Sequence, residues 1–224
     1  MTRKLFWDDP YLTVLETQVE AVNGGEVGLR ETIFFAFSGG QESDAGMIGG
    51  YPVLAAEIRG HDIRYRLPED HQLQPGDLIE VRIDWERRYR LMRLHFAAEL
   101  ILELVYRALP GVQKIGAHIA ADKARIDFLW SENLTPLFPR LIAQAAELIG
   151  QDGAIISAFV AESGQRRYWE LPGFARVSCG GTHLRHAGEV GEITLKRKNV
   201  GQGKERIEIH LDARPPAPAT LSSK

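Results

Sequence analysis

The chain has 224 residues, 44% of them hydrophobic, and a formal net charge of −3. A chain of this length and composition can bury a substantial core in one or two domains, and its only cysteine, Cys179, excludes an intramolecular disulfide. No segment has the roughly 20 apolar residues of a membrane span, and the N-terminus lacks the apolar core of a signal peptide. We therefore expect a cytoplasmic protein without a membrane partner.

The charge is unevenly distributed along the chain. Residues 1–86 carry 7 Lys and Arg against 16 Asp and Glu, a net charge of −9, whereas residues 87–224 carry 20 against 14, a net charge of +6. Basic residues gather at 87–93 and at 196–206. A cationic half can attract a polyanion such as a nucleic acid, although such residues also form ordinary solvated surfaces.

The first part of the chain predicts short strands separated by turns. Several short strands at this spacing indicate a small β-barrel over residues 1–86. A glycine-rich loop, Ser38 to Gly46, interrupts them, and its glycines either supply positive φ in a connector or bring the backbone close to a ligand. The expected strands are 12–22, 31–37, 51–59, 61–67 and 77–84.

After residue 86 the pattern changes to a mixture of helices and strands. A long helix is expected at 86–108 and an amphipathic one at 134–149. With the strands between and after them, they indicate an α+β fold, a two-layer sandwich with a mainly antiparallel sheet over residues 87–213. We expect the proline-rich tail, 214–224, to be disordered. The expected strands are 116–119, 124–129, 154–161, 165–170, 174–178, 192–198 and 205–210.

The run SCGGTH places the thiol of Cys179 four residues before the imidazole of His183. Two glycines let the backbone turn tightly between them, so both side chains can face one metal ion, for which zinc is the natural candidate. His95 and Glu99 offer a matching pair, because positions i and i+4 lie on one face of a helix. The expected metal ligands are therefore these four residues.

Each of the four also has an ordinary structural interpretation. A single cysteine is often a small buried hydrophobe, His95 borders an apolar stripe where a hydrogen-bonded histidine is common, and Glu99 needs no explanation as an exposed helix residue. Taken as isolated spacings, the four residues support a metal site only weakly.

Three segments together resemble the alanyl-tRNA editing proteins, the freestanding AlaX-type relatives of the editing domain of alanyl-tRNA synthetase. The segments are residues 83–95 (IDWERRYRLMRLH), 122–128 (DKARIDF) and 179–191 (CGGTHLRHAGEVG), and the resemblance extends from about Asp8 to Ala213. It implies a small N-terminal β-barrel carrying the glycine-rich loop, followed by a zinc-dependent editing domain. It also implies an enzyme that hydrolyses the ester joining a wrong amino acid, serine or glycine, to tRNA(Ala).

The resemblance also assigns roles to individual residues. Glu99 is either the fourth zinc ligand or a base for the attacking water, and Gln41 and Thr182 contact the amino acid or the terminal ribose. Thr182 is equally interpreted as a turn residue that bonds its own backbone. The remaining residues expected to bind substrate are Gly39, Gly40, Lys123 and Arg125.

The chain departs from the family pattern in two places. The family carries His-x-x-x-His where this chain has His95 and Glu99, and three glycines followed by Gln and Pro where this chain reads FSGGQE. Two alternatives therefore stay open: a divergent member that hydrolyses another aminoacyl or acyl ester, and a catalytically silent tRNA-binding module. The sequence permits a homodimer but does not require one.

Overall fold

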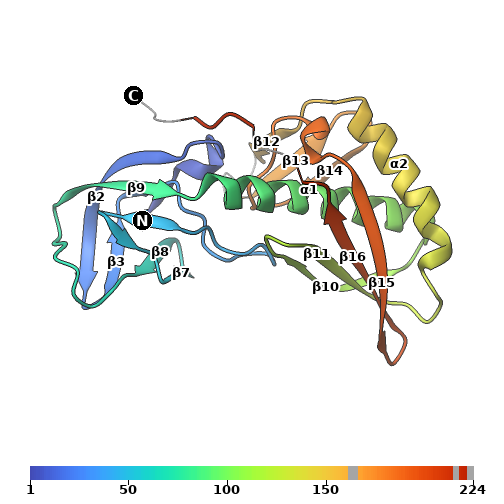
Figure 1. Cartoon of the computed structure of the whole chain (residues 1–224), viewed down its shortest axis with the longest axis horizontal. Coiled ribbons are helices and arrows are strands. Elements are labelled where there is room, and N and C mark those ends of the chain that lie inside the picture. The colour runs from blue at the N-terminus through green and yellow to red at the C-terminus, as the bar shows by residue number, and fades with distance from the viewer. Residues whose placement is uncertain (161–165, 214–216, 221–224) are drawn as a thin grey trace. The chain divides into compact units, whose positions relative to one another are not determined.

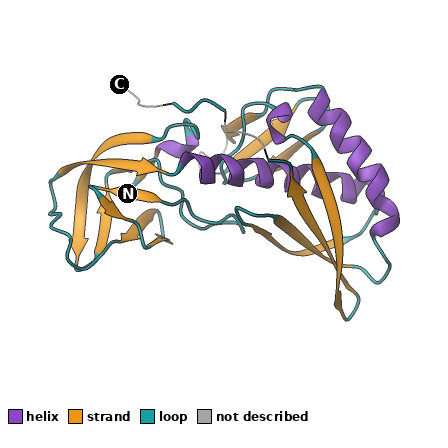
Figure 2. Cartoon of the chain, in the orientation of Figure 1, coloured by secondary structure: helices purple, strands orange, loops and turns teal. Residues whose placement is uncertain are grey.

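A computed structural model of the chain describes residues 1–160, 166–213 and 217–220. Over these residues the protein is a mixed α/β structure with two α-helices and mostly antiparallel strands (Figures 1 and 2). The expected α+β class is thus confirmed. The chain divides into two compact units, one of residues 1–38, 42–89 and 216–224, the other of residues 39–41 and 90–215.

The first unit is built on a curled, half-barrel sheet with the strand order β6-β5-β9-β2-β3-β8-β7 (Figure 1). Its pairings are antiparallel, and inward-facing side chains such as Val19, Val27 and Ile63 form a buried core. A short parallel pair, β1 (Arg3–Lys4) with β4 (Glu31–Thr32), and the 3-10 helix η1 (Leu5–Trp7) belong to this unit. The strands of the sheet are β2 (Val14–Asn23), β3 (Glu26–Leu29), β5 (Gly46–Ile48), β6 (Tyr51–Pro52), β7 (Ala55–Arg59), β8 (Asp62–Arg66) and β9 (Leu78–Ile83).

The second unit contains the two helices and two further antiparallel sheets. One sheet has the order β10-β11-β16-β15 and the other β12-β13-β14. Helix α2 packs on β15 and on the 3-10 helix η3. The helices are α1 (Trp85–Ala108), of which residues 90–108 belong here, α2 (Phe138–Gly150), η2 (Thr135–Leu137) and η3 (Ala187–Val190). The strands are β10 (Gln113–Ile119), β11 (Ala124–Leu129), β12 (Ile156–Phe159), β13 (Arg167–Leu171), β14 (Ala175–Ser178), β15 (Ile193–Gly201) and β16 (Lys204–Leu211).

Helix α1 is buried on most of its sides. Leu91, Phe96 and Ile101 have no exposed surface, although they point in different directions around the helix. Because buried side chains lie on most sides of α1, some of its polar residues, such as Arg93 and His95, are buried as well. Within the described residues, neither α-helix is long and apolar enough to cross a membrane.

Two of the arginines at 87–93, Arg88 and Arg93, are buried and do not contribute to a cationic surface, whereas Arg90 is exposed. The side chain of Arg88 is 0% exposed, pairs with Asp44, and donates to the carbonyls of Pro10 and Ile33 at 2.8 and 2.6 Å. Arg93, 2% exposed, pairs with Asp212 at 2.6 Å. A buried charge is tolerated when it is paired and hydrogen-bonded, as both of these arginines are.

The tail also differs from its expected disorder over the residues that the structure describes. Thr220 pairs with Leu12, its amide donates to the carbonyl of Tyr11 at 2.8 Å, and its carbonyl accepts from the amide of Thr13 at 2.9 Å. The indole of Trp85 donates to the carbonyl of Ala217 at 2.8 Å. These bonds give residues 217–220 defined partners despite their composition. Residues 214–216 and 221–224, and the expected strand ends at 161 and 165, lie outside the described residues.

Candidate metal centre

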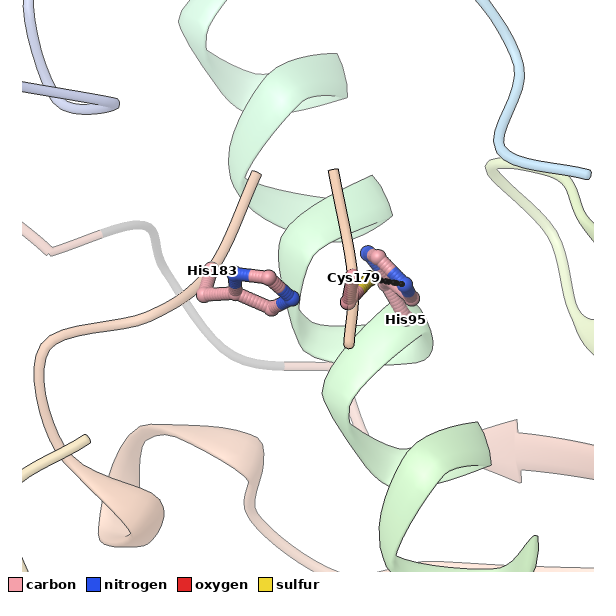
Figure 3. A group of neighbouring side chains, drawn as sticks. All are labelled: His95, Cys179 and His183. Atoms are coloured by element: carbon pink, nitrogen blue, oxygen red, sulfur yellow. Dashed lines mark hydrogen bonds between the residues drawn. The ribbon is translucent and has the colours of Figure 1, made fainter. Parts of the chain in front are cut away.

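Three side chains with metal-binding atoms meet in the second unit (Figure 3). His95 lies on α1, Cys179 directly follows β14, and His183 lies four residues further along the same loop. Their donor atoms all lie within 4.8 Å of one another, and Cys179 Sγ is 3.4 Å from His95 Nε2. The structure therefore brings together three of the four residues that the sequence proposed as ligands.

The donor set fits zinc. Zinc bound tetrahedrally at about 2.0–2.3 Å holds neighbouring donors about 3.4–3.6 Å apart, which matches the separation of Cys179 Sγ and His95 Nε2. His183 Nδ1 lies 3.2 Å from the hydroxyl of Ser157, whereas the buried Nε2 of His183 has no hydrogen-bond partner among the described residues. Because buried polar atoms normally have partners, this nitrogen is the atom available for a metal.

Glu99 lies beside this cluster. Its Oε1 is 3.5 Å from His95 Nε2, but Glu99 is not part of the group whose donor atoms all lie within 4.8 Å. Burial acts to raise the pKa of the carboxyl, but the hydrogen bond and charge of His95 outweigh burial and lower this pKa below its usual value. Glu99 therefore carries a negative charge one helical turn from His95.

The two histidines have opposite protonation preferences in the metal-free protein. Burial acts to lower the pKa of His95, but the interactions with Cys179 and Glu99 outweigh it and raise the pKa to about 10. For His183, burial and then the charges of His95 and Arg167 lower the pKa well below its usual value. A metal would therefore meet a neutral imidazole at His183 and would displace a proton from His95.

A pair of hydrogen bonds joins the glycine-rich loop to the ligand loop. Gln41 Nε2 donates to Thr182 Oγ1 at 2.8 Å, and the amide of Thr182 donates to Gln41 Oε1 at 3.3 Å. Both residues are buried, and both belong to the second unit. The hydroxyl of Thr182 thus accepts a hydrogen bond from a side chain 141 residues away in the sequence.

Known proteins resemble this chain over nearly its whole length, although no protein-family model matches it. It is 32% identical over 216 residues to the alanyl-tRNA editing protein AlaX-M of Pyrococcus horikoshii, covering 95% of this chain and 99% of that protein. The chain belongs to the alanyl-tRNA editing protein family. It is also 32% identical to AlaX-M of Saccharolobus solfataricus, covering 92% of this chain and 98% of that protein. It is 33% identical to the alanine–tRNA ligase of Ignicoccus hospitalis, over a region that covers 93% of this chain but 26% of that protein.

The other residues expected to bind substrate, Gly39, Gly40, Lys123 and Arg125, also lie in the second unit. Gly39 and Gly40 have positive φ, 61° and 90°, and the carbonyl of Gly40 accepts from the amide of Ile119 at 2.7 Å. Lys123 donates to Glu208 at 2.8 Å, and Arg125 pairs with Asp127. The two basic residues are therefore held by carboxylates on the sheet that contains β11.

Sequence reasoning missed two side chains that lie next to the candidate ligands. Ser157, on β12, contacts His183, and the guanidinium of Arg167, on β13, donates to the carbonyl of Gly181 at 3.3 Å. Neither lies near Cys179 or His183 in the sequence, and an isolated serine or arginine on a strand has no distinguishing spacing. Only the pairing of β12 and β13 in one sheet identifies them.

Proposed function

We propose that the protein is a zinc-dependent trans-editing hydrolase that removes serine or glycine from mischarged tRNA(Ala). The observation that carries this proposal is the cluster of His95, Cys179 and His183, whose loop is joined to Gln41 through Thr182, in a chain similar to alanyl-tRNA editing proteins over nearly its whole length. In the reaction, water adds to the ester carbonyl carbon and the bond to the ribose oxygen breaks. The products are the free amino acid and tRNA with a restored hydroxyl.

His95, Cys179 and His183 would hold the zinc ion, with Glu99 as a fourth ligand. When bound, zinc supplies Lewis acidity and a binding position for water or for the α-amino group of the substrate. The distance of 3.5 Å from Glu99 Oε1 to His95 Nε2 suits adjacent ligands, and a movement of the Glu99 side chain toward Cys179 and His183 would complete the set. If a substrate displaced it, its ionised carboxylate would accept the proton of the attacking water.

Gln41 and Thr182 would orient the acylated end of the tRNA. A hydroxyl that accepts a hydrogen bond still carries its own O–H donor, so Thr182 can accept from Gln41 and donate to a substrate oxygen. Gln41 fixes the direction of that hydroxyl, because its amide contacts both the side chain and the backbone of Thr182. A pocket built on polar contacts of this kind can favour serine, which bears a hydroxyl, over alanine.

The experiment that tests this proposal combines metal analysis with deacylation. Wild-type protein and Cys179→Ala are compared on Ser-tRNA(Ala), with Ser131→Ala, at an exposed position, as a control. We expect about one zinc per chain and release of serine for wild type and Ser131→Ala, and loss of both for Cys179→Ala. Zinc-loaded wild type that releases nothing would contradict the proposal and favour another ester substrate or a silent tRNA-binding module.

A further inference from the structure

One face of the sheet β10-β11-β16-β15 carries a regular array of charged side chains. Directly paired residues of antiparallel strands point to the same face. Arg125, Glu208 and Lys196 are paired in one row across the strands, and Asp127, Arg206 and Lys198 in the next. The opposite face holds Ile126, Phe128, Ile207 and Ile209, all buried, which fixes the charged face outward.

The cations of this face outnumber its carboxylates. We call Arg125, Lys196, Lys198, Lys204 and Arg206 the cationic face; together with Asp127 and Glu208 they leave a net charge of +3, five positive less two negative. Asp127 pairs with Arg125 and, at 2.6 Å, with Arg206, while Glu208 accepts from Lys123 at 2.8 Å. The pairs with Asp127 hold Arg125 and Arg206 in place, and Lys196 and Lys198 are exposed.

The cationic face is continuous with the site that contains the metal ligands. The backbone of Gln41 forms a bridge with Ile119 at the end of β10. The residue before Ile119, His118, is paired with Arg125 on β11. The row of Arg125, Glu208 and Lys196 therefore starts one residue from the contact with Gln41 and crosses β11, β16 and β15 in that order. A polyanion whose end lies beside Gln41 and Thr182 would therefore meet a line of cations on leaving the site.

We propose that the cationic face binds the phosphate backbone of the tRNA whose acylated end enters the site. This inference rests on the proposed function, because that function supplies the polyanion. Lys and Arg side chains on a rigid sheet neutralise phosphates without reading sequence, and removing one such cation lowers the affinity and weakens its dependence on salt. Lys196 and Lys198 are the informative positions, since both are exposed and lie on β15, the edge strand farthest from β10.

The test measures binding of uncharged tRNA(Ala) to the zinc-loaded protein over a range of salt concentrations, about 50–200 mM. Lys196→Gln/Lys198→Gln is compared with wild type and with Arg140→Gln, an exposed cation on α2 of the same unit. We expect the double variant to bind about tenfold more weakly at low salt, with a slope of log affinity against log salt reduced by about two. Arg140→Gln should bind like wild type.

Two outcomes would overturn the inference. They are equal tRNA affinity of the double variant and wild type, and an equal loss of tRNA affinity in Arg140→Gln. The measurement is independent of hydrolysis. If the wild-type protein binds tRNA through this face but releases no serine, the proposed function alone is refuted. If the wild-type protein releases serine but Lys196→Gln/Lys198→Gln binds tRNA normally, this inference alone is refuted.

Discussion

Gly181 lies so close to His95 that no side chain fits between them. A β-carbon added to Gly181 would lie 2.2 Å from His95 Cε1 and 2.7 Å from Gln41 Oε1. The neighbouring Gly180 has nothing within 4 Å of the corresponding position. The two glycines of the CGGTH run therefore differ in function: Gly181 lets the ligand loop pack against α1, and neither glycine has the positive φ expected of a tight turn.

This difference predicts opposite results for two alanine substitutions. Gly181→Ala should push the loop away from α1, separate His183 from His95, and abolish stoichiometric zinc binding. Gly180→Ala should bind zinc like wild type, because its added methyl group meets open space. Metal content after dialysis, with circular dichroism to verify folding, measures the effect. Equal zinc content in both folded variants would contradict the arrangement.

The contact between Ser157 and His183 predicts a role in metal affinity. Ser157 Oγ lies 3.2 Å from His183 Nδ1, and groups that fix the second nitrogen of a ligating histidine typically contribute about 10- to 100-fold in metal affinity. Ser157→Ala should therefore weaken zinc binding by about tenfold or more, measured by competition with a chelator. The exposed Ser131→Ala serves as the matched control. An unchanged affinity in Ser157→Ala would remove this serine from the site.

Glu99 is one of the two places at which the sequence departs from the pattern expected of the family, and its role can be tested directly. As a fourth ligand, it should be replaceable by histidine, so Glu99→His should retain zinc and change serine release only a few-fold. Glu99→Gln should lose about tenfold or more in zinc affinity, because an amide is a poorer ligand than a carboxylate. If Glu99→Gln instead keeps its zinc and loses only the rate of release, Glu99 acts as a base.

Zinc binding should depend on pH through His95. Because the pKa of His95 is raised to about 10, its protonated form stabilises the metal-free fold fully below pH 6.5, and this stabilisation is lost as the pH rises toward 10. Zinc must displace that proton, so apparent zinc affinity should rise about tenfold per pH unit from about pH 6.5 to 8.5. Chelator competition across this range measures the slope. A pH-independent affinity would show that His95 is already neutral.

Periodicity predicted most elements of the fold, and its failures have physical causes. The strand expected at 31–37 is shortened to β4, because the backbone of Phe35 bonds to Asp44 instead of joining the sheet: its amide donates to the Asp44 carboxylate and its carbonyl accepts from the Asp44 amide. Strand β3 was not predicted, because it is four residues long and its pattern is interrupted by Gly28. A β-carbon added at this position would strike the side chain of Arg64. Such contacts depend on tertiary structure that local sequence does not reveal.

The candidate ligands were accessible to sequence reasoning because their spacings are local. His95 and Glu99 are one helical turn apart, and Cys179 and His183 share one loop. The supporting contacts are not local: Ser157 reaches His183 across 26 residues, and Gln41 reaches Thr182 across 141. Sequence suggested a role for Gln41 only through the family resemblance, and gave no signal for Ser157.

The most direct measurement is the release of amino acid from Ser-tRNA(Ala) and Ala-tRNA(Ala) by purified protein, with zinc and after its removal by a chelator. We predict that zinc-loaded protein releases serine and leaves alanine attached, and that activity is lost without zinc and returns when zinc is restored. Equal release of both amino acids, or serine release unaffected by removal of zinc, would contradict zinc-dependent editing by this protein.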